Sequence, residues 1–242
     1  MRKLLLPSTP AILSSEFFPV LQLCATDKSL FPNLKTLYLK NTRGLFIPFI
    51  PLLLSSRTTV IDITFRTPEA PKAVIASMVT TFPTLCPNLQ SITLRDLPRD
   101  PIIVAAVSGM LLVTNRNTLR SFCVDSLLTE EAREVIYKLA NLCELSAVIE
   151  KGIPLPPAVL PNLTKLTITY DDGDDCRLQM FRGATLQKLE SVILYSQSGK
   201  IGDLLRAFGR MALAASAQNT LSKSPLHTVL SPSVHATEKS PR

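Results

Sequence analysis

Histidine and tryptophan are nearly absent from this chain. Its 242 residues include no tryptophan and only two histidines, His227 and His235, both close to the C-terminal end. A Ser-His-Asp triad, a Cys-His pair and a typical zinc site all need an imidazole group. Because the sequence before His227 supplies none, we expect a protein that is not an enzyme, with no catalytic residue, no metal and no cofactor.

Paired cysteines are missing too. The five cysteines are odd in number and widely spaced, and none forms a C-x-x-C pair. A disulfide framework or a zinc knuckle needs paired spacing. We therefore expect reduced thiols that serve as small core residues, and hence a cytoplasmic or nuclear protein. The cysteines are Cys24, Cys86, Cys123, Cys143 and Cys176.

The sequence has neither a long apolar run nor a long basic run. Pro7 and Pro10 interrupt the signal-like opening MRKLLL, and the apolar stretches 45–54 and 101–113 cannot span a bilayer. We therefore expect no membrane partner. The net charge is +7, but the basic residues are scattered and only 6% of the residues are aromatic. Nucleic-acid or anionic-surface binding, which favours a basic stripe with stacking aromatics, is therefore an alternative interpretation only.

One phrase is repeated along most of the chain. FPNLKTLYLKN at 31–41 returns as CPNLQSITLRD at 86–96 and LPNLTKLTITY at 160–170. Its core is L-x-x-L-x-L, with apolar residues at positions 1, 4 and 6. Seven units fit this phrase, and their first positions lie 21 to 30 residues apart. The units carry Leu34, Leu37, Leu39; Val60, Ile63, Phe65; Leu89, Ile92, Leu94; Leu119, Phe122, Val124; Leu142, Leu145, Ala147; Leu163, Leu166, Ile168; and Leu189, Val192, Leu194.

Each phrase predicts a strand, and the segments between phrases predict return helices. The second half of the phrase alternates apolar and polar residues, as a strand with one buried face does. The clearest helix is Thr129–Ala140, where Thr129 can cap the first turn and apolar residues share one face. Further helices are predicted at Glu69–Val79, Ile102–Val113 and Ile201–Ala217.

The alternation of strands and helices predicts an α/β fold. A crossover unit in a doubly wound sheet usually needs about 30 residues, with strands that are apolar on both faces. Units of 21 and 23 residues that keep a polar row favour a right-handed βα solenoid instead. We expect an N-terminal partial repeat or cap at 1–30, repeats at 31–217, and a disordered tail or truncated repeat at 218–242. Because both ends look unsealed, we also expect the isolated chain to aggregate.

The PNLxxLxL phrases and their irregular return segments resemble leucine-rich-repeat proteins of the ribonuclease-inhibitor-like and F-box groups, most closely divergent fungal F-box/leucine-rich-repeat proteins. The resemblance covers Phe31–Tyr195, with Pro225–Leu230 as the start of an eighth unit. It implies a protein-interaction scaffold, the substrate-recognition part of an SCF-type ubiquitin ligase. No F-box is visible in 1–30, so a cullin-linked adaptor is expected only if an F-box lies upstream. The sequence is then either a piece of a longer protein or similar to relatives without the box.

The resemblance has one clear departure. The ninth position, usually Asn or Cys in such repeats, carries neither here, so we expect the units to turn by less regular means. It holds Thr42, Pro68, Leu97, Leu127, Glu150, Asp171 and Gln197.

Two short motifs suggest ligands but fit them poorly. The acidic run YDDGDD at 170–175 lacks the alternating oxygens and the closing Glu of a calcium loop, so a solvated loop is the favoured interpretation and cation binding stays open. Ser198-Gly199-Lys200 lacks the first glycine and the Ser or Thr of a phosphate loop.

The outward positions 3, 5 and 7 predict the binding surface, because they line the concave face of a solenoid. Position 7 reads Lys40, Arg66 and Arg95 in the first three units, a basic row that we expect to contact acidic residues of a protein partner of unknown identity. An α/β enzyme remains the least favoured alternative. The predicted contact residues are Tyr38, Lys40, Asp62, Arg66, Thr93, Arg95, Asp125, Lys165 and Tyr195.

Overall fold

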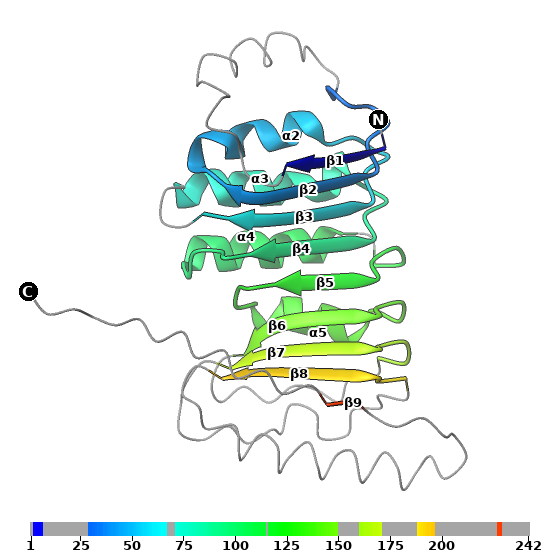
Figure 1. The fold of residues 1–242 in the computed structure, drawn as a ribbon. Helices are drawn as coiled ribbons and strands as arrows, with labels where there is room; N and C mark the ends of the chain where they lie inside the picture. The colour runs from blue at the N-terminus through cyan, green and yellow to red at the C-terminus, as the bar shows by residue number, and fades with distance from the viewer. Residues whose placement is uncertain are drawn as a thin grey trace, which may run out of the picture.

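A single parallel sheet runs through the part of the chain that the structure describes, residues 2–6, 29–66, 71–114, 116–149, 160–170, 188–196 and 227–228 of a computed structural model. The nine strands lie side by side in the order of the sequence (Figure 1). They are β1 Lys3–Leu6, β2 Thr36–Thr42, β3 Val60–Phe65, β4 Ser91–Arg95, β5 Ser121–Val124, β6 Glu144–Ile149, β7 Lys165–Tyr170, β8 Ser191–Ser196 and β9 His227–Thr228.

The described helices all lie on one face of this sheet (Figure 1). The 3-10 helix η1 spans Gly44–Phe49, α2 Ile50–Leu53, α3 Lys72–Leu85, α4 Pro101–Val113 and α5 Glu130–Tyr137. A doubly wound sheet reverses its strand order and carries helices on both faces. Within the described ranges neither feature occurs, so the predicted α/β class is confirmed with one sheet whose strands follow one another in a single direction.

The core lies between the sheet and the helices, and the repeated phrase builds it. Residues at position 4 of successive units are register partners, so their side chains stack in one row beneath the helices. Phe122 in this row is fully buried, and Phe82 of α3 packs into the same core with no exposed surface. The row consists of Leu37, Ile61, Ile92, Phe122, Leu145, Leu166 and Val192.

A repeated set of backbone hydrogen bonds joins the units just before each strand. The carbonyl of Lys35, at position 2, accepts the N–H groups of Thr59 and Val60 in the next unit, at 2.8 and 3.1 Å. The same fork recurs at every junction from β1 to β8, which makes the units equivalent in geometry although their connecting segments differ in length. The other accepting carbonyls are those of Arg2, Thr59, Gln90, Arg120, Cys143 and Thr164.

The residue just before position 1 bridges neighbouring units at the same edge in three successive units. Asn141 donates its side-chain amide to the carbonyl of Asn117 at 2.9 Å, and Asn162 donates to the carbonyl of Ala140 at 2.9 Å. Lys188 occupies the equivalent place in the next unit and donates to Asn162 Oδ1 at 2.7 Å. In these units the side chain before position 1 therefore links each unit to the preceding one.

The second unit was assigned wrongly from the sequence. The phrase was placed on Val60, Ile63 and Phe65, but the register pairs Leu37 with Ile61 and Leu39 with Ile63. Position 1 is therefore Thr58, a polar residue with no exposed surface. Its hydroxyl donates to the carbonyl of Leu34 at 3.0 Å and accepts the N–H of Ser55 at 3.1 Å, and these bonds satisfy a polar group in a leucine position.

Two strands lie at the ends of the predicted array. β1 was not predicted, although MRKLLL fits the phrase with Met1, Leu4 and Leu6 and pairs with β2 from Lys3 to Leu6. β9 lies within the predicted eighth unit and pairs His227 with Ser191. The order of units therefore extends beyond the seven that the pattern identified.

Two of the predicted helices, and residues 71–79 of a third, fall in the described residues. α4 begins one residue before the predicted Ile102 and ends at Val113 as expected, while α3 continues to Leu85 rather than ending at Val79. α5 is shorter than predicted, but Thr129 caps it by accepting the N–H of Ala132 at 3.4 Å. The predicted helix at 201–217 lies outside the described residues.

The backbone is left-handed at position 8 in two units, within β2 where its register to β3 shifts and directly after the end of β4. Asn41 has φ 52° and Asp96 has φ 56°, each one residue before the ninth position of its unit. Asn and Asp tolerate this conformation better than other residues with a side chain. The less regular turn that the sequence predicted is therefore made at position 8, while Thr42 and Leu97 at position 9 are buried.

Candidate binding face

The face of the sheet opposite the helices carries no described helix, and the predicted contact residues lie on it or at its edge. Tyr38, Asp62 and Thr93 are register partners at position 5 and form one row across β2, β3 and β4. Lys165 lies at position 3 of β7, beside Glu144 of β6. Tyr195 belongs to β8, but its side chain is outside the described residues.

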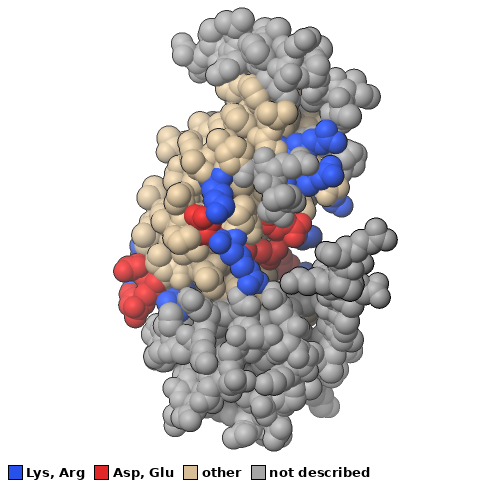
Figure 2. Space-filling model, turned by 90° about the vertical axis from the view of Figure 1, so that its left-hand side faces the viewer, with Lys and Arg blue, Asp and Glu red and all other residues tan. Residues whose placement is uncertain are grey.

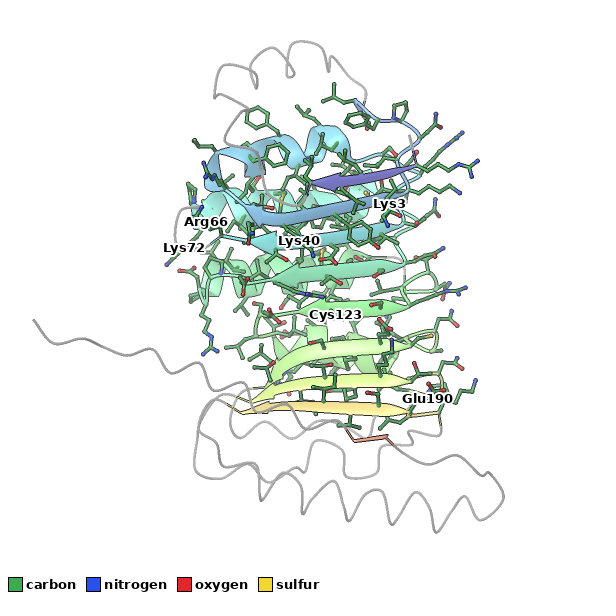
Figure 3. All side chains as sticks on the ribbon, viewed as in Figure 1. Lys3, Lys40, Arg66, Lys72, Cys123 and Glu190 are labelled. Atoms are coloured by element: carbon green, nitrogen blue, oxygen red, sulfur yellow. The ribbon has the colours of Figure 1, made fainter. Side chains whose placement is uncertain are left out.

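Arg66 does not belong to the predicted basic row. Because the second unit starts at Thr58, Thr64 takes position 7 between Lys40 and Arg95. Arg66 follows the end of β3 and donates its backbone N–H to Thr42 at 3.0 Å. Figure 3 places Lys40 over the sheet and Arg66 near the edge at which the strands end. The expected row Lys40, Arg66, Arg95 is therefore interrupted by a neutral threonine.

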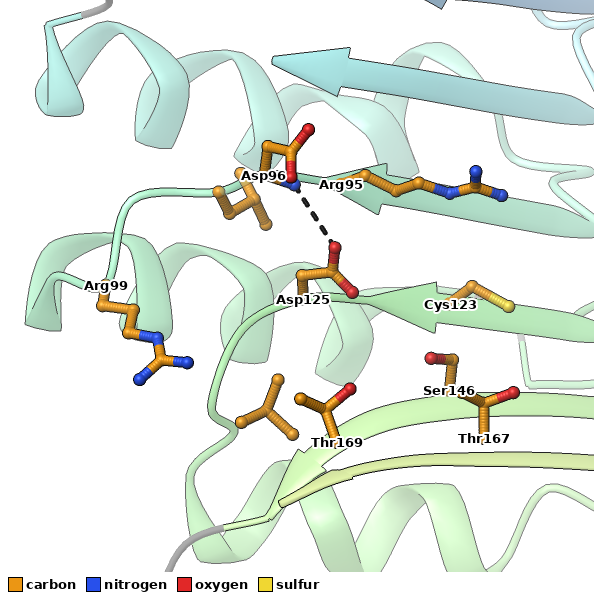
Figure 4. Close-up of a pocket in the computed structure, with 10 residues that line it drawn as sticks. Arg95, Asp96, Arg99, Cys123, Asp125, Ser146, Thr167 and Thr169 are labelled. Atoms are coloured by element: carbon orange, nitrogen blue, oxygen red, sulfur yellow. Dashed lines mark hydrogen bonds between the residues drawn. The ribbon is translucent and has the colours of Figure 1, made fainter. Parts of the chain in front are cut away.

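A hollow of about 690 Å³ lies on the open face near the carboxyl ends of β4 to β7 (Figure 4). Of the nine predicted residues, Arg95 and Asp125 line it. Most of the remaining lining comes from positions 5 and 7 of the units that start at Leu119, Leu142 and Leu163, which the phrase identifies from the sequence. Asp96 and Arg99 lie beyond those positions and could not be found from the periodicity. The complete lining is Arg95, Asp96, Leu97, Arg99, Cys123, Asp125, Ser146, Val148, Thr167 and Thr169.

Asp125 is the half-buried carboxylate of this hollow. Its Oδ2 accepts the backbone N–H of Asp96 at 3.3 Å, the dashed contact in Figure 4. Burial raises the pKa of Asp125 above its ordinary value, and the hydrogen bond from Asp96 only partly offsets this. Within the described residues no cation lies at ion-pair distance from Asp125. The hollow therefore holds a desolvated negative charge beside the exposed guanidinium of Arg95.

Hydroxyl and thiol groups form a second wall of the hollow, which crosses β5, β6 and β7. Cys123, Ser146 and Thr167 are half-buried at position 5 of β5, β6 and β7, and all three are labelled in Figure 4. Burial also raises the pKa of the Cys123 thiol, so the thiol stays protonated near neutral pH. This wall offers hydrogen-bond donors and acceptors without charge, whereas a reactive cysteine needs a lowered pKa.

A charged ladder fixes the strands next to the hollow. Ser121 donates to Glu144 Oε2 at 3.2 Å, and Glu144 Oε1 binds the ammonium of Lys165 at 2.7 Å. The hydrogen bond and the charge of Glu144 raise the pKa of Lys165. Lys165 was predicted as a contact residue, but its charge is already matched by a neighbouring strand.

Charges of both signs are mixed on the molecule. Lys3 lies 4.9 Å from the ring centre of Tyr38, and Lys72 binds Asp100 at 2.6 Å. Figure 2 looks onto the side at which the strands end and shows Lys or Arg side chains next to Asp or Glu, with no continuous basic stripe on the described part of this side.

The described residues hold neither a candidate metal cluster nor a helix that could span a membrane. Among the described residues no three His, Cys, Asp or Glu side chains gather where they could hold a metal ion. The described cysteines, Cys86, Cys123 and Cys143, are free thiols. Within the same ranges no helix has the length and apolar character needed to cross a membrane. Residues 171–175 of the acidic run, the Ser198-Gly199-Lys200 motif, Cys24 and Cys176 lie outside the described residues.

Comparison with known proteins gives no family for this fold. No family model, no curated protein and no solved structure matches the chain.

Proposed function

We propose that the chain is a leucine-rich-repeat solenoid that binds a protein partner through the open face of its sheet. Three features support the solenoid. The strands follow sequence order, the apolar positions are register partners, and the same backbone fork joins every pair of units from β1 to β8. Repeats of this kind stack so that each contacts only its neighbours and leave one extended face for binding.

The hollow beside Asp125 carries the functional part of the proposal. A half-buried carboxylate, two arginines and a wall of hydroxyls meet on a face that no described helix covers. The polar side chains of the hollow are half-buried or exposed, so a bound segment can reach them and replace water as their hydrogen-bond partner. A protein loop can supply anionic, cationic and neutral groups at once, which matches this mixture.

The mixture of charges favours a protein over a nucleic acid. Phosphate backbones are bound by basic stripes. Here Asp62, Asp125 and Glu144 share the face with Lys40 and Arg95. We therefore retain the scaffold function, and with it the role suggested by the F-box resemblance, recognition of substrates for an SCF-type ubiquitin ligase. The free thiols support a cytoplasmic or nuclear location.

Affinity capture with charge-reversed variants tests the proposal. Full-length wild type and Arg95→Glu are used as baits, with Arg120→Glu as the matched control. Arg120 is also exposed but lies just before β5, at the opposite end of the strands from the hollow. We expect a protein that wild type and Arg120→Glu retain and Arg95→Glu loses, with equal thermal unfolding of all three. Equal capture by Arg95→Glu would refute the assigned face.

A further inference from the structure

The outer face of α4 is apolar although it points away from the core. Ile102 is 54% exposed, Leu112 41% and Val113 73%. These make up three of the five large exposed hydrophobic residues among those described, the others being Leu5 and Leu45. Soluble proteins scatter such residues singly, so their concentration on one helix indicates a contact surface.

The outward-facing residues form a stripe along the helix, in which Gly109 is half-exposed and the others are exposed. Ile102, Ala105, Gly109 and Leu112 are spaced by three, four and three residues, which places them on one side of an α-helix. Large residues lie at both ends of the stripe and small ones in the middle. A second helix that crosses the middle of the stripe could therefore approach closely.

Gly109 gives independent evidence for that approach. Glycine in a helix interior costs about 1 kcal/mol relative to alanine. No contact in the chain demands it, because a Cβ at this position would meet no atom within 4 Å. The helix-propensity cost of Gly109 is explained if the backbone of a partner packs against this position, because any side chain here would keep that backbone at a distance.

The helices beside α4 define the charge of the partner. α4 packs between α3 and α5. The exposed residues of α3 are mainly small or polar, including Ser77 and Thr80, whereas the first turn of α5 exposes Glu130 and Glu131. Further along α5, Glu134 is ion-paired with Lys138 at 3.7 Å. An acidic flank on one side of an apolar stripe is complemented by an amphipathic helix with basic residues on the corresponding flank.

We infer that the outer face of α4 is a second protein-binding surface, which takes an amphipathic helix of a partner with a small-residue apolar stripe and a basic flank. This surface lies on the opposite side of the sheet from the hollow (Figure 1). It stands independently of the proposed function, because it rests on α4 and α5 alone.

A displayed library of 18-residue helical peptides tests the inference. Stripe positions vary among Ala, Gly and Leu, and flank positions between Lys and Glu. The full chain is the bait, Leu112→Asp is the counter-bait, and Ser77→Asp is the control that adds the same charge to α3. Enriched peptides should carry a Lys flank, bind wild type and Ser77→Asp equally, and bind Leu112→Asp at least tenfold more weakly.

Gly109→Ala separates binding from folding, because the two effects have opposite signs. It should raise the Tm by about 2–4 °C through helix propensity, yet weaken the selected peptides at least tenfold. The inference is overturned if no peptide is enriched, if the peptides carry Glu flanks, or if Gly109→Ala binds them as wild type does. It is equally overturned if sedimentation shows a dimer that Leu112→Asp dissociates, because the occupant is then a second copy of the chain.

Discussion

The hydroxyl of Thr58 donates to the carbonyl of Leu34 across 3.0 Å, from a position that other units give to leucine. The same oxygen accepts the N–H of Ser55 at 3.1 Å. Thr58 and Leu34 both have no exposed surface, so the bond links two units inside the core. This arrangement explains how a polar residue occupies the first position of the phrase.

Thr58→Val should destabilise the fold although it keeps the shape of the side chain. Ser55 N–H loses its acceptor in a buried place, which typically costs about 1–3 kcal/mol. Thr59→Val is the control, because the Thr59 hydroxyl makes a longer, exposed bond to Lys35 at 3.3 Å. Urea denaturation should show a clear loss for the first variant and a change below about 0.5 kcal/mol for the second. Equal stability of Thr58→Val and wild type would contradict the role of the buried bonds.

The second unit, which starts at Thr58, also indicates how far the sequence determines the structure. Period and alternation predicted β2 and β4 to β8, because their buried positions are apolar. The register of β3 was missed because the pattern identifies core positions by apolarity, while Thr58 is buried through hydrogen bonds. β1 was missed because basic residues followed by leucines also resemble a signal segment.

The hollow could be predicted only in part. Positions 5 and 7 point to one face in every unit, so the side chains of β5, β6 and β7 were identifiable from the spacing. Asp96 and Arg99 lie after the strand, where the left-handed backbone of Asp96 sets the direction of the chain. A periodic pattern holds no information about that turn.

Asp125→Asn should increase stability at pH 7. Because burial raises the folded-state pKa of Asp125, its ionised form is disfavoured by folding. The penalty is present above the folded-state pKa and disappears as the pH falls below the unfolded value. Denaturation curves at neutral and acidic pH should therefore show an advantage of the variant that shrinks on acidification. Asp62→Asn is the control, because it removes an aspartate from the same face. If Asp125→Asn were less stable than wild type at pH 7, hydrogen bonds and nearby charges would fully compensate the burial of the Asp125 carboxylate, which would contradict this prediction.

Asp100 should behave in the opposite way. Its hydrogen bond to Lys72 lowers the pKa of Asp100, and the N–H of Ile102 acts in the same direction. The ionised form therefore stabilises the fold at neutral pH, and this contribution is lost as the pH falls through the lowered pKa. Asp100→Asn keeps an acceptor for the N-cap of α4 but removes the charge. Its deficit in Tm should be measurable at pH 7 and vanish at low pH; a deficit independent of pH would point to capping alone.

Cys86 should resist alkylation in the native protein. Burial raises its pKa to about 12, and its side chain is 1% exposed, so neither thiolate nor access is available at pH 8. Cys143 is the comparison, because its thiol donates an exposed hydrogen bond to the carbonyl of Asn141. Peptide mapping after iodoacetamide treatment should find Cys143 modified and Cys86 intact until denaturant is added. Equal rates for both thiols in the native state would show that the core around Thr58 opens readily.

Hydrogen–deuterium exchange in the presence of the captured partner tests the central claim, that the open face is the binding surface, most directly. The account predicts that the partner slows exchange at the carboxyl ends of β4 to β7, around residues 95–99, 123–126, 146–149 and 167–170. With Arg95→Glu in place of wild type, adding the partner should leave exchange in these segments unchanged. Slower exchange confined to segments away from these strand ends would contradict it.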